Sequence, residues 1–216
     1  MNMALASADR GPLGMAAMNP APALLSVENL ALSRGGRQLF AGVGFVLRPG
    51  DFLLLRGPNG AGKSSLLLAL AGILRPDGGT IDWHAPEPPK LHLVGHQAGV
   101  KTRLSLIENL GFWREVNGGS GMRPEAAIEA VGLGGLGSLD AGYLSAGQTK
   151  RLALARLLVT DRAIWLLDEP AASLDKAGDA LVARLVGDRL ASGGVVIAAT
   201  HDDIAGATAI VMLGAA

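Results

Sequence analysis

The sequence contains no cysteine, which excludes a disulfide framework, a thiolate metal site and a cysteine nucleophile. Aromatic residues make up only 4% of the 216 residues, which argues against a surface on which nucleic-acid bases stack. The formal net charge is +0, so the whole chain carries no general attraction toward nucleic acid or anionic lipid. Any binding partner must therefore be recognised by local features.

A long hydrophobic run is also missing, although 49% of the residues are hydrophobic. No run reaches the roughly 18 apolar residues that a membrane-spanning helix needs. The longest candidates are interrupted at Arg56, Gly72, Arg156 and Asp168. We therefore expect a protein with an apolar surface patch that contacts a partner. Residues 1–22 lack a signal-peptide pattern and are predicted to be a disordered leader.

Apolar periodicity and turn residues predict an α/β protein. Strands are expected at residues 24–32, 38–47, 52–55, 80–83, 91–94, 163–167, 195–199 and 209–213, with a hairpin turn at 34–37. Helices are expected at residues 65–71, 105–116, 124–131, 145–158 and 176–190. Because residues 102–158 offer no strand candidate, we predict a helical subdomain inserted into a mostly parallel βα frame.

One loop carries specific chemistry, since residues 57–64 match G-x-x-x-x-G-K-[ST] between an apolar run and a helix. Glycines let backbone N–H groups approach phosphate oxygens, and the helix that follows adds its positive end. Lys63 can reach the β- and γ-phosphates, and the Ser64 hydroxyl can hold Mg²⁺. A glycine-rich turn with a surface lysine is the plain alternative. The predicted nucleotide contacts are Gly57, Pro58, Asn59, Gly60, Ala61, Gly62, Lys63, Ser64 and Ser65.

Two carboxylates follow the apolar run at residues 163–167. The carboxyl ends of parallel strands border the ligand site of an open α/β sheet, so Asp168 is a candidate Mg²⁺ ligand beside Ser64. Glu169 is a candidate general base toward the attacking water. Ordinary carboxylates at a strand end are the alternative. Ser145 begins a helix whose free N–H groups offer a second anion site, although any capped helix shares this pattern.

The stretch from Leu144 to Gln148, with the sequence LSAGQ, resembles the signature motif of the ATP-binding-cassette (ABC) ATPases, with Ala146 where many members have glycine. The order of elements agrees: the phosphate loop, Gln97, the signature, Asp168-Glu169, Ser173-Leu174-Asp175 and Thr200-His201. The resemblance covers about residues 24–213. It implies an α/β P-loop NTPase of the ABC ATPase type over residues 23–214. Such a domain has a mostly parallel core sheet, an N-terminal antiparallel β part and a helical subdomain at about 102–158. ATP and Mg²⁺ are the implied cofactors.

The resemblance also implies residue roles. Gln97 matches a glutamine that senses Mg²⁺ and γ-phosphate, and His201 matches a switch histidine that contacts γ-phosphate. Ser145 and Gly147, with Gln148 in the same motif, would contact the ATP bound to a second chain. Asp175 matches an aspartate that carries signals between the two sites, and it is also a natural helix N-cap. Many members stack an aromatic residue on adenine; this chain offers Arg34 instead, with Arg37 as a competitor.

The hinge segment, residues 94–105, closely resembles the ATPase subunits of the haem exporters of cytochrome c maturation. This implies ATP hydrolysis coupled to haem export or to release of a haem chaperone. It also implies a second ATPase chain, integral membrane permease subunits and a peripheral position on the cytoplasmic face of the bacterial inner membrane. No nucleic acid is expected as a partner. We expect Trp113 to lie at or near the groove for a membrane subunit, with Leu106, Leu110 and Phe112 divided between core and groove.

Three alternatives remain at this stage. The chain could serve a transporter for a lipid, a lipoprotein or a metal chelate. A soluble cassette acting on nucleic acid or ribosomes is less consistent, since the chain has no coiled coil, no second cassette and no basic excess. A cassette that binds ATP without hydrolysing it is disfavoured by the presence of Lys63, Asp168, Glu169 and His201.

Overall fold

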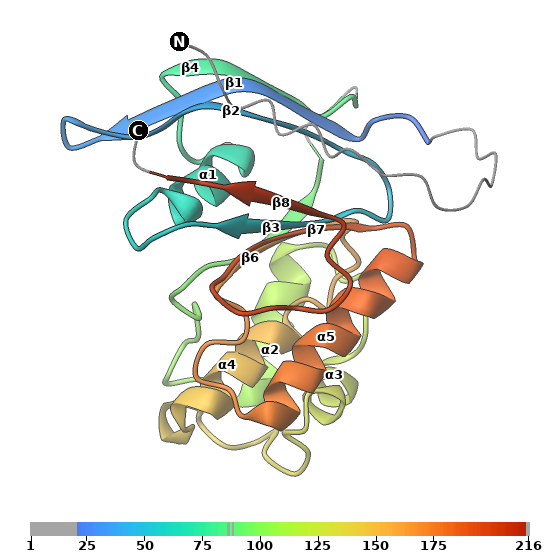
Figure 1. The fold of residues 1–216 in the computed structure, drawn as a ribbon. Coiled ribbons are helices and arrows are strands. Elements are labelled where there is room, and N and C mark those ends of the chain that lie inside the picture. Colours follow the sequence, from blue (N-terminus) through green and yellow to red (C-terminus); the bar gives the residue numbers. More distant parts are fainter. Residues whose placement is uncertain (1–20, 86, 88, 215–216) are drawn as a thin grey trace.

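The computed structural model describes residues 21–85, 87 and 89–214; residues 1–20, which hold nearly all of the predicted leader, lie outside it. The chain forms layers (Figure 1). An antiparallel sheet covers helix α1 (Lys63–Leu70), which in turn covers a parallel sheet, and the other helices lie on the opposite face of that sheet. This is the predicted α/β arrangement.

The parallel sheet has the strand order β5-β6-β7-β3-β8. Its strands are β3 (Phe52–Arg56), β5 (Leu91–Val94), β6 (Ile164–Asp168), β7 (Val195–Ala199) and β8 (Ala209–Met212). The central strands β6 and β7 are buried along their whole length, which explains why they are continuous apolar runs. Alternate residues serve opposite faces: Phe52 and Leu54 join the core with the helices, whereas Leu53 and Leu55 join the core beneath the antiparallel sheet.

The antiparallel sheet has the order β2-β1-β4, with β1 (Leu25–Arg34), β2 (Arg37–Leu47) and β4 (Gly78–Asp82). Arg34 pairs with Arg37, so Gly35 and Gly36 form a two-residue hairpin turn. Their φ values of 59° and 75° explain the glycines, because such a turn needs positive φ at both positions. The predicted hairpin is confirmed.

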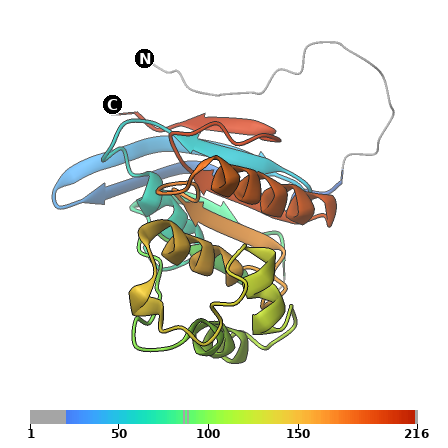
Figure 2. The ribbon, with the colours of Figure 1, turned by 90° about the horizontal axis from the view of Figure 1, so that it is seen from below.

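The remaining helices are α2 (Leu106–Val116), α3 (Pro124–Ala130), α4 (Ala146–Ala155) and α5 (Lys176–Ala191), with a short 3₁₀ turn at Ala141–Tyr143. Figure 2 shows α2, α3 and α4 grouped together, while α5 lies along the sheet. Within the described chain, residues 102–158 form no strand and only one isolated bridge, between Ser105 and Asp140. No helix of the described residues has both the length and the apolar character that crossing a membrane requires.

The predicted end of α4 at residue 158 is wrong, since the helix stops at Ala155. The N–H groups of Leu157 and Leu158 bond back three residues, each at 3.0 Å, which tightens the chain out of the α-helix. Arg156 directs its side chain to the hinge segment: Nη1 donates to the Ala98 carbonyl at 3.0 Å, and the guanidinium lies 3.7 Å from the centre of the Trp113 ring. Burial lowers the pKa of Arg156 to about 10, so it stays charged at neutral pH.

Candidate nucleotide-binding site

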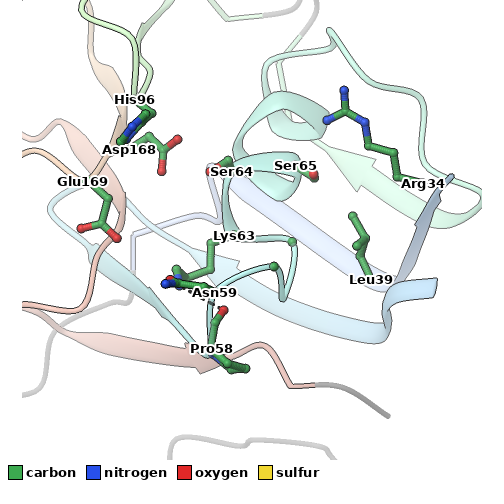
Figure 3. A pocket seen from close by; sticks show the side chains of 12 residues that line it. Arg34, Leu39, Pro58, Asn59, Lys63, Ser64, Ser65, His96, Asp168 and Glu169 are labelled. Carbon is green, nitrogen blue, oxygen red and sulfur yellow. Dashed lines mark hydrogen bonds between the residues drawn. The ribbon is translucent and has the colours of Figure 1, made fainter. Parts of the chain in front are cut away.

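A pocket of about 420 Å³ lies where β3 and β6 end and α1 begins (Figure 3). In this view the Asp168 carboxylate points toward Ser64, while Lys63 and Asn59 lie on the phosphate loop below. The pocket thus joins the predicted phosphate loop to the predicted carboxylates. Its lining residues are Arg34, Leu39, Pro58, Asn59, Gly60, Gly62, Lys63, Ser64, Ser65, His96, Asp168 and Glu169.

The phosphate loop depends on glycine at two positions. Gly57 has φ 140°, and an added Cβ would lie 1.9 Å from the Leu213 carbonyl oxygen. Gly62 has φ 95°, and an added Cβ would lie 2.8 Å from the Phe40 ring. Gly62 precedes α1 without a side-chain cap, so the first N–H groups of that helix remain available to an anion. The donor set therefore fits a phosphate group.

Lys63 is buried within this loop. Its Nζ donates to the Gly57 carbonyl at 2.7 Å and to the Pro58 carbonyl at 3.3 Å. These neutral carbonyls hold the ammonium without a carboxylate, and Lys63 lines the pocket. A lysine held in this way can donate to phosphate oxygens.

The two carboxylates have different settings. Asp168 is buried at the end of β6, and Nζ of the buried Lys150 lies 3.4 Å from its carbonyl oxygen. Burial lowers the pKa of Lys150, and the Asp168 and Glu169 carboxylates oppose that shift. Glu169 has φ 47°, a left-handed conformation that costs a non-glycine residue on the order of 1 kcal/mol. Its N–H donates to the Ala199 carbonyl at 2.8 Å, which holds it beside the pocket.

His201 reaches the phosphate loop from the loop after β7. Its Nε2 lies 3.0 Å from Lys63 Nζ, 3.0 Å from Asn59 Oδ1 and 3.8 Å from Glu169 Oε1. A single ring nitrogen either accepts from Lys63 or donates to Asn59, so the two contacts exclude each other.

Other predicted residues lie outside the pocket lining. Gln97 is exposed, and its neighbour His96 lines the pocket instead. Ser145 and Gln148 form a capping box at the start of α4, with Gln148 N–H to Ser145 Oγ at 3.3 Å and Ser145 N–H to Gln148 Oε1 at 2.9 Å. Gly147 lies in the first turn of that helix, where a Cβ would lie 3.1 Å from the Ser173 carbonyl oxygen. Their roles toward nucleotide remain predictions.

Asp175 is confirmed as the N-cap of α5, since its carboxylate accepts from the Gly178 N–H at 2.9 Å. The same oxygen accepts from Arg151 of α4 at 3.1 Å. The Gly178 N–H and then the Arg151 guanidinium lower the pKa of Asp175. Asp175 therefore connects α4, whose first turn carries the LSAGQ motif, to α5.

The structure distinguishes the two arginines of the hairpin. Arg34 lines the pocket, whereas Arg37 is not among its lining residues. Leu39 also lines the pocket, and neither it nor His96 was predicted from the sequence. His96 stands directly before Gln97 in the sequence, and this adjacency to a predicted site residue could have identified it. Leu39 gave no such signal, because its position depends on how the antiparallel sheet lies over α1.

We expect Arg34→Ala to raise the ATP dissociation constant about threefold to tenfold, since a cation–π contact is worth roughly 0.5–1.5 kcal/mol. Arg37→Ala is the matched control, because it removes the same charge from the other side of the hairpin. Isothermal titration calorimetry of both variants with ATP measures the difference. Equal losses in both variants would mean that only the hairpin charge matters and would contradict the assignment of Arg34 to adenine.

A second group of polar residues lies on the antiparallel sheet. Ser26 Oγ is 2.7 Å from His84 Nε2, and His84 Nδ1 is 3.3 Å from Asp82 Oδ2. This order of contacts is that of a Ser-His-Asp triad. The His84 and Asp82 side chains are exposed to solvent, whereas acyl transfer needs a site that excludes water. We assign the trio to linking β1 with the end of β4.

Comparison with known proteins agrees with this geometry. The family model for ABC transporters matches residues 40–172. The cytochrome c biogenesis ATP-binding export proteins CcmA from two strains of Rhodopseudomonas palustris are 48% and 49% identical over 197 residues, which cover 89% of this chain and 98% of each relative. The protein of the same name from Mesorhizobium japonicum is 48% identical over 82% of this chain and 91% of its own length.

Solved structures show the same fold. An ABC transporter ATP-binding protein from Pyrococcus furiosus superposes with a TM-score of 0.78 at 22% identity, covering 88% of this chain and 96% of that one. An ABC transporter of the metal-chelate type, in an inward-facing conformation, gives a TM-score of 0.75 at 28% identity, covering 90% of this chain and 81% of that one. From the family match, the close relatives and the shared fold, this chain belongs to the ABC transporter family, as an ATP-hydrolysing subunit.

Proposed function

We propose that this chain powers the export step of cytochrome c biogenesis, moving haem or releasing a haem-loaded chaperone by ATP hydrolysis. The proposal depends on one observation: relatives named for that export are nearly half identical over almost their whole length. The intact hydrolytic set around Lys63, Asp168, Glu169 and His201 supports an active ATPase. A subunit that only binds nucleotide would not need to keep these groups together.

The residues of the pocket divide the chemistry among them. Lys63 and the N–H groups at the start of α1 would bind the β- and γ-phosphates of ATP. The Ser64 hydroxyl and the Asp168 carboxylate, with Gln97 as a further candidate, would hold Mg²⁺, which neutralises charge on those phosphates. Glu169 accepts the proton of the attacking water as a general base. His201 orients that water and the γ-phosphate from its position beside Lys63 and Glu169.

A second copy of the chain completes the site in this proposal. Ser145, Gly147 and Gln148 lie outside the lining of the phosphate-loop pocket of their own chain. The capping box shows that they sit at the N-terminal end of a helix, where an anion is favoured. A homodimer would place this helix end over the γ-phosphate held by the other copy. Asp175, bonded to both α4 and α5, supports a role in linking the two sites.

An apolar face beside the hinge segment fits membrane permease subunits. On α2, Leu106 and Leu110 are fully buried, whereas Phe112 and Val116 are 39% and 62% exposed. Trp113 lies between them, partly buried under Arg156. Docking at this face would place the chain peripherally on the cytoplasmic side of the bacterial inner membrane. Changes in the nucleotide site would then reach the permease through the hinge segment.

Co-purification from membranes tests this proposal. The tagged chain, extracted in mild detergent, should retain permease subunits that function in cytochrome c maturation, identified by mass spectrometry. Trp113→Ala and Phe112→Ala should each lower their yield several-fold. Ile210→Ala on β8, which removes a side chain that is 54% exposed, should leave it unchanged. Unchanged yield with Trp113→Ala would remove that residue from the groove, and a permease for a lipid or metal chelate would overturn the haem assignment.

A further inference from the structure

We propose that Arg56 is a positioning residue that holds the His201 loop, residues 200–205, against the phosphate loop and thereby sets the turnover rate. The proposal depends on the ATPase function proposed above. Arg56 is the last residue of β3 and stands directly before Gly57, the first residue of the phosphate loop. Its side chain reaches the backbone that carries His201.

Within the part of the chain that the structure describes, the hydrogen bonds of the Arg56 side chain all go to that loop. Nη1 donates to the carbonyl of His201, and Nη2 donates to the carbonyl of Asp202 at 2.7 Å. Nη2 also contacts Asp203 Oδ1 at 2.6 Å. The Arg56 side chain is only 16% exposed, whereas the Asp203 carboxylate is fully exposed. The planar guanidinium presents several N–H donors in a fixed arrangement, so it can donate to two successive carbonyls at once. A lysine ammonium is a single point charge and lacks this geometry.

Besides the His201 side-chain contacts with Lys63 and Asn59 and the burial of Ile204 in the core, few hydrogen bonds in the described chain hold the backbone of this loop. The Thr200 N–H reaches the Leu55 carbonyl at 3.4 Å, and the Asp202 N–H bonds within the loop to Thr200 Oγ1 at 3.0 Å. Among the described residues, Arg56 supplies the hydrogen bonds that bind the backbone of His201 and Asp202 to another element. On its other side the loop borders a cavity of about 670 Å³, lined also by residues 171–174 and part of α5. Without Arg56, the loop has room to shift into that cavity.

The position of this loop matters to the chemistry. His201 Nε2 lies 3.0 Å from Lys63 Nζ and 3.8 Å from Glu169 Oε1. A displacement of about 1 Å in a catalytic group can cost roughly 100-fold in rate. The phosphate cradle itself consists of the glycine loop, Lys63 and the start of α1, and the hydrogen bonds of the Arg56 side chain go to residues 201–203 instead. Losing Arg56 should therefore impair turnover much more than nucleotide binding.

Steady-state kinetics of the full chain test this split. Arg56→Gln should lower kcat about tenfold to 100-fold, with KM and the ATP dissociation constant changed by less than about threefold. Arg56→Lys should recover part of the rate, because it keeps the charge and can reach one carbonyl. Asp203→Asn should stay within about twofold of the unmodified chain, since exposed ion pairs contribute little. Arg48→Gln, an exposed arginine just after β2, is the matched control and should keep both constants.

A double-mutant cycle shows whether Arg56 acts through His201. In a His201→Ala background, Arg56→Gln should lower the residual rate by less than about twofold. Hydrogen exchange of the amides in residues 200–205 should rise in Arg56→Gln, while exchange in β7 stays unchanged. If the glutamine variant does not fold, Arg56→Lys replaces it in both measurements, the rate in the His201→Ala background and the hydrogen exchange of residues 200–205. An unchanged kcat, a further tenfold loss in the His201→Ala background, or unchanged exchange would each overturn the proposal.

Failure of the ATPase function is distinguishable from failure of this inference. Absence of ATP hydrolysis by the unmodified chain with its partners, or full activity of His201→Ala, would contradict the proposed function. Hydrogen exchange needs no turnover, so it decides in either case whether Arg56 holds the His201 loop.

Discussion

Replacing Glu169 by glutamine is expected to lower ATP turnover at least about 100-fold while ATP stays bound. Glutamine has nearly the same shape and keeps the backbone N–H bond to Ala199, so the pocket should persist. It cannot accept the proton of the attacking water, and only the general-base step is lost. Because the γ-phosphate of ATP is then not cleaved, it continues to bridge the two copies of the chain, and the dimer should persist. A phosphate-release assay measures the rate, and gel filtration with and without ATP reports the dimer.

The control for this change is Glu125→Gln, which alters an exposed carboxylate on α3. It should hydrolyse ATP at the unmodified rate and show no ATP-dependent dimer trapping. An unchanged rate in Glu169→Gln would remove Glu169 as the base. Glu169 has φ 47° in this chain, and glutamine is expected to keep that backbone, so a loss in Glu169→Gln should report on the carboxylate rather than on the fold.

Lys63→Ala should weaken ATP binding itself. Lys63 is expected to donate to two phosphates, and a hydrogen bond to a charged group contributes about 1.5–3 kcal/mol. Loss of one such bond corresponds to roughly a tenfold to 150-fold rise in the dissociation constant, and loss of both to more. Removing the ammonium also leaves His201 Nε2 with Asn59 as its partner. Calorimetric titration with ATP measures the constant.

Lys90→Ala is the control, because it removes an exposed lysine near the start of β5. Both variants should unfold at similar temperatures, since the carbonyls of Gly57 and Pro58 that Lys63 now satisfies can turn to water in the open pocket. An ATP affinity unaltered by Lys63→Ala would contradict the assignment of residues 57–64 as a phosphate-binding loop. Together with Glu169→Gln, this variant separates binding from hydrolysis.

Local patterns account for the parts that the sequence predicted well. The phosphate loop needs glycines at fixed offsets from a strand and a helix, so its spacing is readable without the fold. The predicted helix starts at Ser105 and Ser145 depend on residues only three positions away, and each start forms a capping box. The end of α4 was missed, and there Arg156 contacts Trp113 and Ala98, which belong to another part of the chain that the local pattern does not include.

The elements, the phosphate loop, the carboxylates after β6 and the family could therefore be predicted from the amino-acid sequence, because each depends on neighbours within a few residues or on the order of motifs. The tertiary structure alone decided that Arg34 and not Arg37 lines the pocket, and that His96 lines it while Gln97 does not. The tertiary structure also brings His201 to Lys63, which is 138 positions away in the sequence, and lets Arg56 hydrogen-bond to the loop that carries His201. These contacts arise because β3 and β7 pair in parallel, with Leu55 opposite Ala199, so both loops leave the sheet at the same edge.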